Sequence, residues 1–403
     1  MDVRMTDRKR VLHVITGLNV GGAETWLCRL LTGMAGGCWG KRLEHRVVTL
    51  LPCGPLAEPI RALGVEVESL GMARGIPSPG AVLRLAGIMR SWRPHVVQTW
   101  LYHADLLGFV ARALAFGSRP ALSWGIRCAY MDFSKYGLGT RLTVRACAAL
   151  SGRVQTVVAN SQAGAEHHVR ELGYDAGTMR VLENGVDMER CRPDAAARAE
   201  LRAEWGLGEG EVLVGLVARV DPMKGHDVFC RMARLVRERC GGNVRFVFCG
   251  QGTRPGEEGW PDLQAMLEES GLRDSAVLLG QRRDVERVWA ALDVAVLPSL
   301  GEGFPNALLE ALACGVPAVA LDVGDAAAIV GPGGAVVPAA GDVEARARSL
   351  AAQVERLVLA GGEERTRLGR AGRVHVSGRY ALEAAVGGWA EHLYGLACLS
   401  KQG

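Results

Sequence analysis

The sequence has few lysines, few aromatic residues and no cysteine pattern typical of a metal site. Only five of its 47 basic residues are lysine, and aromatic residues make up 5%. Its 11 cysteines form no C-x-x-C pair and no His/Cys cluster at ligand spacing, which argues against a zinc site or a disulfide framework. A chain of 403 residues buries enough apolar surface to fold without such cross-links. We therefore expect reduced thiols in a cytoplasmic protein that needs no metal.

Several other classes are disfavoured by what is missing. No run of about 18 uncharged, strongly apolar residues is present, so no membrane-spanning helix is expected. The first fourteen residues contain no apolar segment typical of a signal peptide. The sequence contains no Walker A, G-x-S-x-G or H-E-x-x-H motif. Because no dense basic run is interleaved with aromatic residues, we expect no nucleic-acid partner.

The net charge of +4 is unevenly distributed along the chain. Residues 1–190 hold 23 Lys and Arg against 15 Asp and Glu, whereas residues 191–403 hold 24 against 28. This asymmetry indicates two lobes with different partners. A basic lobe suits an anionic membrane surface or a phosphorylated acceptor, although scattered, solvated arginines would give the same count.

Short β-rich runs alternate with helical patterns, and the series starts twice. This alternation predicts an α/β protein with two parallel, doubly wound, Rossmann-like sheets. The first set of predicted strands comprises residues 11–18, 44–50, 65–70, 95–100, 121–126 and 155–161. The second set comprises residues 212–218, 244–250, 276–280, 294–298 and 317–322.

The predicted boundary between the lobes follows the turn Asn184-Gly185, with a polar linker over about 187–210. We predict an N-terminal domain over 1–187, a C-terminal domain over 188–375 and a final helical segment over 376–403. We expect the two sheets to face each other across a cleft. Ligands of such sheets bind beyond the carboxyl ends of the strands, so residues there are the candidates for function.

The most specific motif is SLGEGFPNALLE, which directly follows a predicted strand. Glu302 lies in its Gly-rich loop, and Glu310 lies eight positions later on the helix that Pro305 opens. Along a helix axis this spacing separates the carboxylates by roughly 10 Å. Each can accept hydrogen bonds from sugar or ribose hydroxyls, while the helix N-terminus between them favours a phosphate.

A second motif, ARVDPMKG, follows the first strand of the C-terminal domain. Arg219 and Lys224 emerge from it just beyond the strand. Arg offers a planar fork to phosphate oxygens and Lys a compact charge, so the pair predicts a diphosphate site. Two surface cations at an ordinary turn would give the same pattern in isolation.

The N-terminal domain supplies weaker candidates. Gly21 and Gly22 open a helix after the first strand, where a backbone can approach a phosphate or sugar closely. His103 starts the helix after the fourth strand, where an imidazole could contact a sugar hydroxyl; neighbouring Asp105 is interpreted as a first-turn helix charge. Arg127 ends the fifth strand and is a candidate for an anionic part of the acceptor.

These motifs resemble those of the retaining glycosyltransferases of family 4, also called glycosyl transferases group 1, which have the GT-B fold. The resemblance extends over about residues 10–380 and rests on GGAE (21–24), NGVD (184–187), ARVDPMKG and EGFPNALLE (302–310). It implies transfer of a sugar from a nucleotide diphosphate sugar, with UDP favoured, to a hydroxyl of a glycan, a lipid-linked or a metabolite acceptor. It implies no metal or other cofactor.

The resemblance also implies residue roles. Arg219 and Lys224 would bind the donor diphosphate, and Glu310 the ribose. Glu302 would bind the transferred sugar, and His103 would be the active-site histidine. The remaining donor contacts implied by the family are Gly21, Gly22, Gln281, Arg282, Gly303, Phe304 and Asn306. The final helix would return to the N-terminal domain. Separately from the resemblance, the cysteines and the basic N-terminal half lead us to expect a cytoplasmic protein with peripheral contact to the inner membrane face.

Three alternatives remain open on the sequence. A sugar phosphorylase or a nucleotide-sugar epimerase could use the same scaffold, and a degenerate transferase could act as a binding protein. The cationic turn and the Glu pair argue against the epimerase, and the presence of each expected donor residue argues against degeneration.

Overall fold

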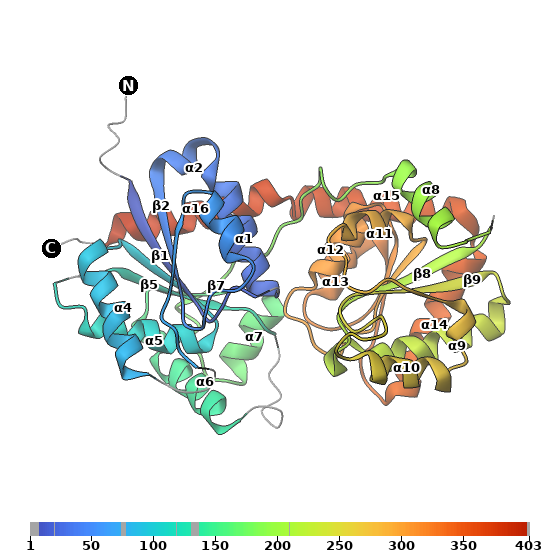
Figure 1. Cartoon of the computed structure of the whole chain (residues 1–403), viewed down its shortest axis with the longest axis horizontal. Coiled ribbons are helices and arrows are strands. Elements are labelled where there is room, and N and C mark those ends of the chain that lie inside the picture. The colour runs from blue at the N-terminus through green and yellow to red at the C-terminus, as the bar shows by residue number, and fades with distance from the viewer. Residues whose placement is uncertain are drawn as a thin grey trace. The chain divides into compact units, whose positions relative to one another are not determined.

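The structure, a computed structural model, describes residues 8–19, 21–73, 78–117, 119–129, 137–208 and 210–400. The chain forms two compact units (Figure 1). One unit ends at Asn184 and is completed by the segment that begins at Leu382, and the other is Gly185–Ala381. Each unit is a parallel sheet with helices on both faces, as the sequence predicts for an α/β protein.

The sheet of the first unit has the order β3-β2-β1-β4-β5-β6-β7. Its strands are β1 (Lys9–Ile15), β2 (Leu43–Thr49), β3 (Glu66–Ser69), β4 (Val96–Trp100), β5 (Ala121–Ile126), β6 (Thr156–Ala159) and β7 (Met179–Val181). Its helices are α1 (Gly22–Ala35), α2 (Gly37–Arg42), α3 (Ala57–Ala62), α4 (Pro79–Trp92), α5 (Tyr102–Leu114), α6 (Leu138–Leu150), α7 (Gln162–Arg170) and α16 (Leu382–Leu399).

Successive side chains of a strand point to opposite faces of its sheet, and β1 shows why helices cover both. Leu12 and Val14 pack into the apolar cluster under α4, α5 and α6. Val11 and Ile15 pack into the cluster under α1, α3 and α16. A strand that is buried on both faces is a nearly continuous apolar run rather than an alternating one, and VLHVI is interrupted only by the buried His13.

The last helix, α16, belongs to the first unit although it is last in sequence. Trp389 of α16 stacks on Trp100 at the end of β4, with ring centroids 5.2 Å apart. A Cβ on Gly33 of α1 would lie 2.8 Å from Val386 Cγ2, so the absence of a side chain at Gly33 lets α1 and α16 pack closely.

The sheet of the second unit has the order β10-β9-β8-β11-β12-β13. Its strands are β8 (Val212–Val217), β9 (Val244–Cys249), β10 (Ala276–Leu278), β11 (Val294–Leu297), β12 (Ala318–Leu321) and β13 (Gly334–Val337). Its helices are α8 (Ala195–Glu204), α9 (His226–Cys240), α10 (Trp260–Glu269), α11 (Val285–Ala291), α12 (Asn306–Ala313), α13 (Ala326–Val330), α14 (Val343–Leu359) and α15 (Gly361–Arg379).

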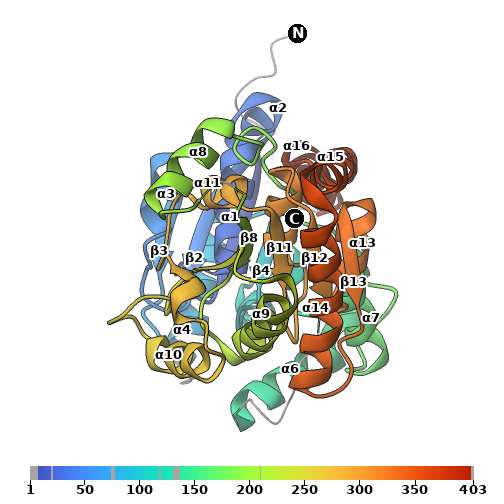
Figure 2. The same ribbon diagram turned by 90° about the vertical axis from the view of Figure 1, so that its right-hand side faces the viewer.

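Strand β9 illustrates how this second core is divided. Phe246 and Phe248 face α9 and meet the ring of Phe229 edge-on, at centroid distances of 6.2 and 5.0 Å. Val247 and Cys249 face the opposite cluster, which contains α11, α12 and α15. Helices α9 and α14 lie side by side on the first of these faces (Figure 2).

Two details differ from the sequence-based expectation. The polar stretch 187–210 is not simply a linker, because it contains α8, whose Arg198 and Arg202 donate to Asp293 at 2.6 and 3.0 Å. The expected strands also omit β7 and β13, which lie at an edge of each sheet. Both are short, and apart from Val337 none of their residues is fully buried, with Arg180 exposed; they therefore show little apolar patterning.

Across the described residues, no helix combines the length and the apolar character that crossing a bilayer would require.

Candidate active site

The loops of interest in the second unit lie at the switch point of its sheet. From β8 the chain continues outward to β9, whereas from β11 it continues in the opposite direction to β12. The loops that leave such a pair of central strands diverge and create a crevice at the carboxyl edge. The loop after β8 contains Arg219 and Lys224, and the loop after β11 contains Glu302. The sheet order thus brings together three residues that the sequence separates.

The central contact is an ion pair between these loops. Lys224 Nζ donates to Glu302 Oε1 at 2.6 Å, and the two side chains are 26% and 13% exposed. The Leu300 amide donates to the Met223 carbonyl at 2.9 Å, which ties the backbones together beside the pair. The ion pair and this backbone hydrogen bond together fix both charged groups at the same edge of the sheet.

Arg219 is held by its own turn. Its Nε and Nη2 donate to Asp221 Oδ2 at 3.2 and 3.0 Å, and Asp221 Oδ1 accepts the Met223 amide at 2.9 Å. Burial acts to raise the pKa of Asp221, but the Met223 amide and the Arg219 guanidinium outweigh it, so the pKa is lowered. The ionised carboxylate orients Arg219, whose side chain is 59% exposed and therefore open to a phosphate.

Two glycines allow the loops to approach each other. Gly225 has φ +67°, and a Cβ there would lie 2.1 Å from the Pro298 carbonyl oxygen after β11. Gly324, which follows β12, has φ +56°, and its Cβ would lie 2.5 Å from the carbonyl oxygen of Glu302. Only glycine meets both demands, a left-handed backbone and no side chain.

The rest of the predicted donor set is distributed along the same edge of the sheet. Asn306 is the first residue of α12 and follows Pro305, as predicted, and Glu310 lies one turn later. Phe304 is 5% exposed and meets Tyr380 edge-on at 5.7 Å. Its side chain is therefore part of the core, which leaves only its backbone for a ligand.

The segment predicted to contact the base follows β10. Arg282 donates twice to Asp284, from Nε to Oδ1 at 2.9 Å and from Nη2 to Oδ2 at 2.6 Å. This hydrogen-bonded carboxylate raises the pKa of Arg282. Gln281 is exposed. The loop thus presents one fixed cation and one exposed amide side chain.

The first unit has its own switch point, between β1 and β4. Gly21 caps α1 and Gly22 begins it, and a Cβ on Gly22 would have no atom within 4 Å. Space is therefore open beside Gly22, as close approach of a ligand requires, whereas a Cβ on Gly21 would clash with the Glu24 carboxylate. Loop residue 20 lies outside the described residues.

His103 lies in the first turn of α5, at the same switch point, as predicted. Its side chain is exposed, and partial loss of solvent around the ring lowers its pKa. The residue before this helix turn, Leu101, has φ +74°, a conformation that non-glycine residues adopt only at a cost of about 1–3 kcal/mol. The sequence gives no indication of this strain.

A chain of three hydrogen bonds anchors the turn at Leu101 and Tyr102. His168 Nδ1 lies 2.7 Å from the Gly164 carbonyl, which only accepts, so Nδ1 carries the proton. His168 Nε2 then accepts from the Tyr102 hydroxyl at 2.7 Å. The Tyr102 oxygen in turn accepts from Cys128 Sγ at 2.8 Å. Tyr102 is therefore fixed at its far end, and it holds the strained turn that carries His103.

Tyr102→Phe tests this anchoring. The change leaves the His168 and Cys128 groups without their partner, so we expect the free energy of unfolding to fall by about 1–3 kcal/mol and turnover to fall with little change in donor KM. Urea unfolding and steady-state kinetics measure both. Tyr394→Phe, whose ring lies against Trp39 and Arg42 instead, is the matched control. An unchanged kcat in Tyr102→Phe would contradict the positioning role.

Asp105 lies in the first turn of α5, as predicted, but it does not face solvent. Its side chain is fully buried, and Thr99 Oγ1 donates to its Oδ1 at 2.5 Å. Burial raises the pKa of Asp105 to about 8, against the opposing effects of Thr99, Gly125 and Arg127. Its Oδ2 has no partner among the described residues, which suits a neutral carboxylic acid.

This shift predicts a pH dependence of stability. Between its ordinary value of 3.8 and about 8, the folded protein holds more protons at Asp105 than the unfolded chain. Its contribution to the free energy of unfolding therefore falls as the pH rises, by at most about 1.4 kcal/mol per unit. Asp105→Asn, which mimics the neutral acid, should flatten this slope.

The informative range is from about pH 6.5 to 8, because burial lowers the pKa of His13, His45 and His168, which therefore stay neutral there. Urea unfolding of both proteins across this range measures the effect. If the free energy of unfolding changed with pH equally in the two proteins, Asp105 would be ionised in the folded state.

Arg127 lies inside the unit. Its guanidinium carbon is 4.5 Å from the ring centroid of Trp100 and 5.1 Å from that of Trp389, and Nη1 donates to Asn184 Oδ1 at 3.1 Å. Burial lowers the pKa of Arg127 to about 9. An acceptor contact would require this side chain to leave its aromatic partners, so that role stays a prediction.

Comparison with known proteins agrees with this geometry. Residues 211–360 match the family described as glycosyl transferases group 1, and residues 20–190 match glycosyltransferase family 4. The chain belongs to the family 4 glycosyltransferases. The family 4 match falls on the first unit of the transferase and the group 1 match falls on the second unit.

Related sequences bear similar names. EpsF of Bacillus subtilis strain 168, which its name places among the glycosyltransferases, is 27% identical over 339 residues, covering 79% of this chain and 80% of that protein. A D-inositol 3-phosphate glycosyltransferase of Segniliparus rotundus is 33% identical over 237 residues. That match covers 58% of this chain and only 50% of the relative.

Solved structures share the fold over nearly the whole length. HepE of Anabaena, crystallised with UDP and glucose, gives a TM-score of 0.80 at 21% identity, over 96% of this chain and 99% of that one. Sucrose-phosphate synthase of Thermosynechococcus elongatus gives 0.78 at 18% identity, over 98% and 100%. The transferase thus has the predicted GT-B fold, with two Rossmann-like domains.

Proposed function

We propose that the protein is a retaining glycosyltransferase that uses a nucleotide diphosphate sugar. The observation that carries this proposal is the Lys224–Glu302 ion pair at the switch point of the second sheet, with Arg219 on the same loop as Lys224. Two cations suit a diphosphate, and an adjacent carboxylate suits sugar hydroxyls. A UDP-sugar is the favoured donor, supported by the binding of UDP and glucose in HepE.

In the proposed mechanism, negative charge develops on the departing diphosphate and positive charge on the sugar. Arg219, Lys224 and the N-terminus of α12 would stabilise that diphosphate by electrostatics fixed in advance. The bond from the anomeric carbon to phosphate oxygen breaks while the acceptor oxygen bonds on the same face. The acceptor proton passes to the leaving phosphate oxygen, so we assign no protein general base.

The acceptor is proposed to be a hydroxyl of a glycan, a lipid-linked sugar or a small metabolite. The proposal includes no metal and places the protein in the cytoplasm. The basic first unit supports an anionic or lipid-linked acceptor over a neutral one, because cations attract such partners.

A donor panel tests the proposed function. The full chain is incubated with UDP- and GDP-sugars, thermal shift identifies those that bind, and nucleotide release with mass spectrometry of the products identifies those that react. We expect a UDP-sugar to raise the melting temperature and to release UDP slowly even with water as acceptor. Release only upon addition of inorganic phosphate would indicate a phosphorylase, and binding without release a non-enzymatic protein.

A further inference from the structure

One layer of the first unit exposes apolar side chains that a water-facing surface does not need. Helices α4, α5 and α6 pack beside one another over the same face of the sheet (Figure 1). Among the described residues, nine large apolar side chains are exposed, and six of them belong to this layer. They are Leu83, Val110, Leu114, Phe116, Leu138 and Leu142. Phe116 and Leu138 are 77% and 71% exposed.

The exposed residues follow helical spacing, so they form stripes rather than isolated points. On α5, Val110 and Leu114 lie seven and eleven positions after His103, which places all three within about 20° of one line along the helix. On α6, Leu138 and Leu142 are four positions apart and Arg145 follows three later, on the same side. The apolar stripe of α5 therefore ends at the candidate active-site histidine.

The charge of this layer has one sign. Between Pro79 and Gln155 the sequence holds ten basic residues and two acidic ones, Asp105 and Asp132. Asp105 is buried, and Asp132 lies outside the described residues. Exposed cations are Arg90 on α4, Arg119 after α5, Arg145 on α6 and Arg153 after it. No exposed acidic side chain is found in the described part of this segment.

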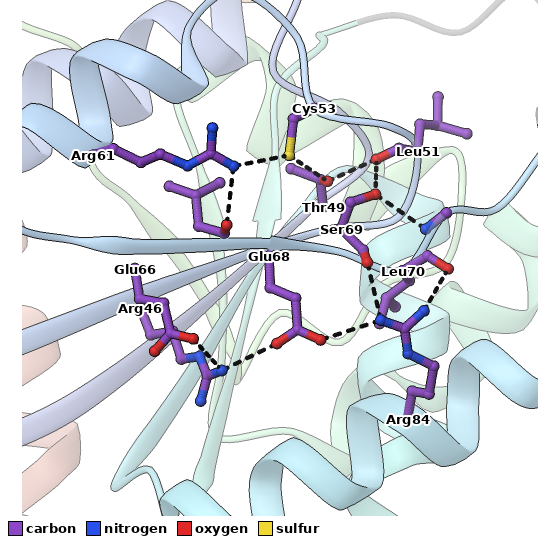
Figure 3. A network of polar contacts seen from close by, with 12 residues as sticks. Arg46, Thr49, Leu51, Cys53, Arg61, Glu66, Glu68, Ser69, Leu70 and Arg84 are labelled. Atoms are coloured by element: carbon purple, nitrogen blue, oxygen red, sulfur yellow. Dashed lines mark hydrogen bonds and ion pairs between the residues drawn. The ribbon is translucent and has the colours of Figure 1, made fainter.

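The carboxylates of β3, which lie beside α4, are paired with arginines (Figure 3). Arg46 Nη2 binds Glu66 Oε1 at 2.6 Å and Glu68 Oε2 at 3.0 Å. Arg84 Nη2 binds Glu68 Oε1 at 3.2 Å, and the same guanidinium donates to the carbonyls of Ser69 and Leu70. Arg84 is therefore used within the unit, and the acidic edge beside α4 does not cancel the cations of the layer.

We propose that the outward face of α4, α5 and α6 docks on an anionic lipid bilayer. Apolar side chains that enter the interface, flanked by arginines that contact lipid phosphates, are the two components of such binding. A second copy of this chain fits less well, because a symmetric contact would place arginine against arginine. The inference deepens the proposed function, since it rests on the lipid-linked class of acceptor and places His103 at the end of the docked stripe.

Vesicle sedimentation of the full chain tests the proposal. Vesicles of phosphatidylcholine alone are compared with vesicles that contain phosphatidylglycerol. We expect binding to the anionic vesicles only, weakened by high salt because the contacts are screened. The variants Phe116→Ser with Leu142→Ser, and Arg119→Glu with Arg145→Glu, should each lower the bound fraction at least about tenfold.

Matched controls lie in the second unit. Leu359→Ser with Val374→Ser removes two apolar side chains that are also exposed, and Arg348→Glu reverses an exposed charge; both variants should bind vesicles like the unmodified protein. Equal binding by the α4–α6 variants, binding to neutral vesicles alone, or a dimer that these variants dissociate would overturn the proposal.

Donor turnover is measured on the same samples without vesicles. Since the variants change only exposed residues outside the site, slow nucleotide release should persist in them. Loss of vesicle binding with turnover intact supports the docking surface. Vesicle binding without turnover with any donor would reject the proposed function and leave the docking surface standing, so the two failures are distinguishable.

Discussion

Replacing Lys224 by alanine is expected to lower kcat/KM for the donor at least about tenfold, equivalent to 1.4 kcal/mol of transition-state stabilisation. The variant removes a cation proposed to face the leaving diphosphate and leaves Glu302, which is only 13% exposed, without its ion pair. Glu302→Gln keeps the shape but removes the charge, and we expect a loss of similar size. Steady-state release of nucleotide over a range of donor concentrations measures both.

The two effects should not add, because each variant breaks the same contact of 2.6 Å. The double variant is expected to be about as impaired as the worse single one. Arg231→Ala and Glu269→Gln break another ion pair of the same unit, at 3.2 Å between α9 and α10, and should leave kcat/KM near its original value. Near-native turnover of Lys224→Ala and Glu302→Gln would refute the assigned roles.

Gly225→Ala is expected to have the second large effect. At φ +67° an added Cβ would lie 2.1 Å from the Pro298 carbonyl oxygen, so the turn must move or the two loops must separate. Either response displaces Lys224, the residue before it. We expect the free energy of unfolding to fall by at least about 2 kcal/mol and donor turnover to fall at least tenfold, as thermal or urea unfolding and kinetics would show.

Gly271→Ala separates backbone strain from the clash. Gly271 has φ +64°, yet a Cβ there would meet no atom within 4 Å. In this control the free energy of unfolding should fall only by the cost of a left-handed backbone at a non-glycine residue, about 1–2 kcal/mol. Turnover should be retained. If Gly225→Ala behaved like Gly271→Ala in both measurements, the close approach of the β8 and β11 loops would not matter for activity.

Much of the fold and the family were predictable from the sequence, for a physical reason. Central strands of a parallel sheet are buried on both faces, so they are nearly continuous apolar runs, such as VLVGLV, and VRFVFC with its single Arg245. The edge strands β7 and β13 have only three and four residues, and they depend on pairing with a neighbour rather than on their own pattern. Helix α8 was overlooked because its surface is polar, while its position is fixed by Asp293, far along the chain.

The residues of the candidate site were predictable from the sequence, but the contacts between them were not. Glu302 and Lys224 were predicted to contact different parts of the donor, whereas the structure shows that they also bind each other. The burial of Asp105, the aromatic partners of Arg127 and the strained Leu101 depend on α16, α7 and β5. Contacts between elements that are distant in sequence leave no local pattern, so residue type alone indicated neither the burial of Asp105 nor the aromatic partners of Arg127.

The most direct test of the central claim is a crystal structure of the protein with UDP. The account predicts diphosphate oxygens within hydrogen-bonding distance of Arg219 and Lys224, the ribose beside Glu310 and the base near Gln281 and Arg282. Ligand density in the second unit away from these residues, or a diphosphate bound with Lys224 still turned from it, would contradict the account.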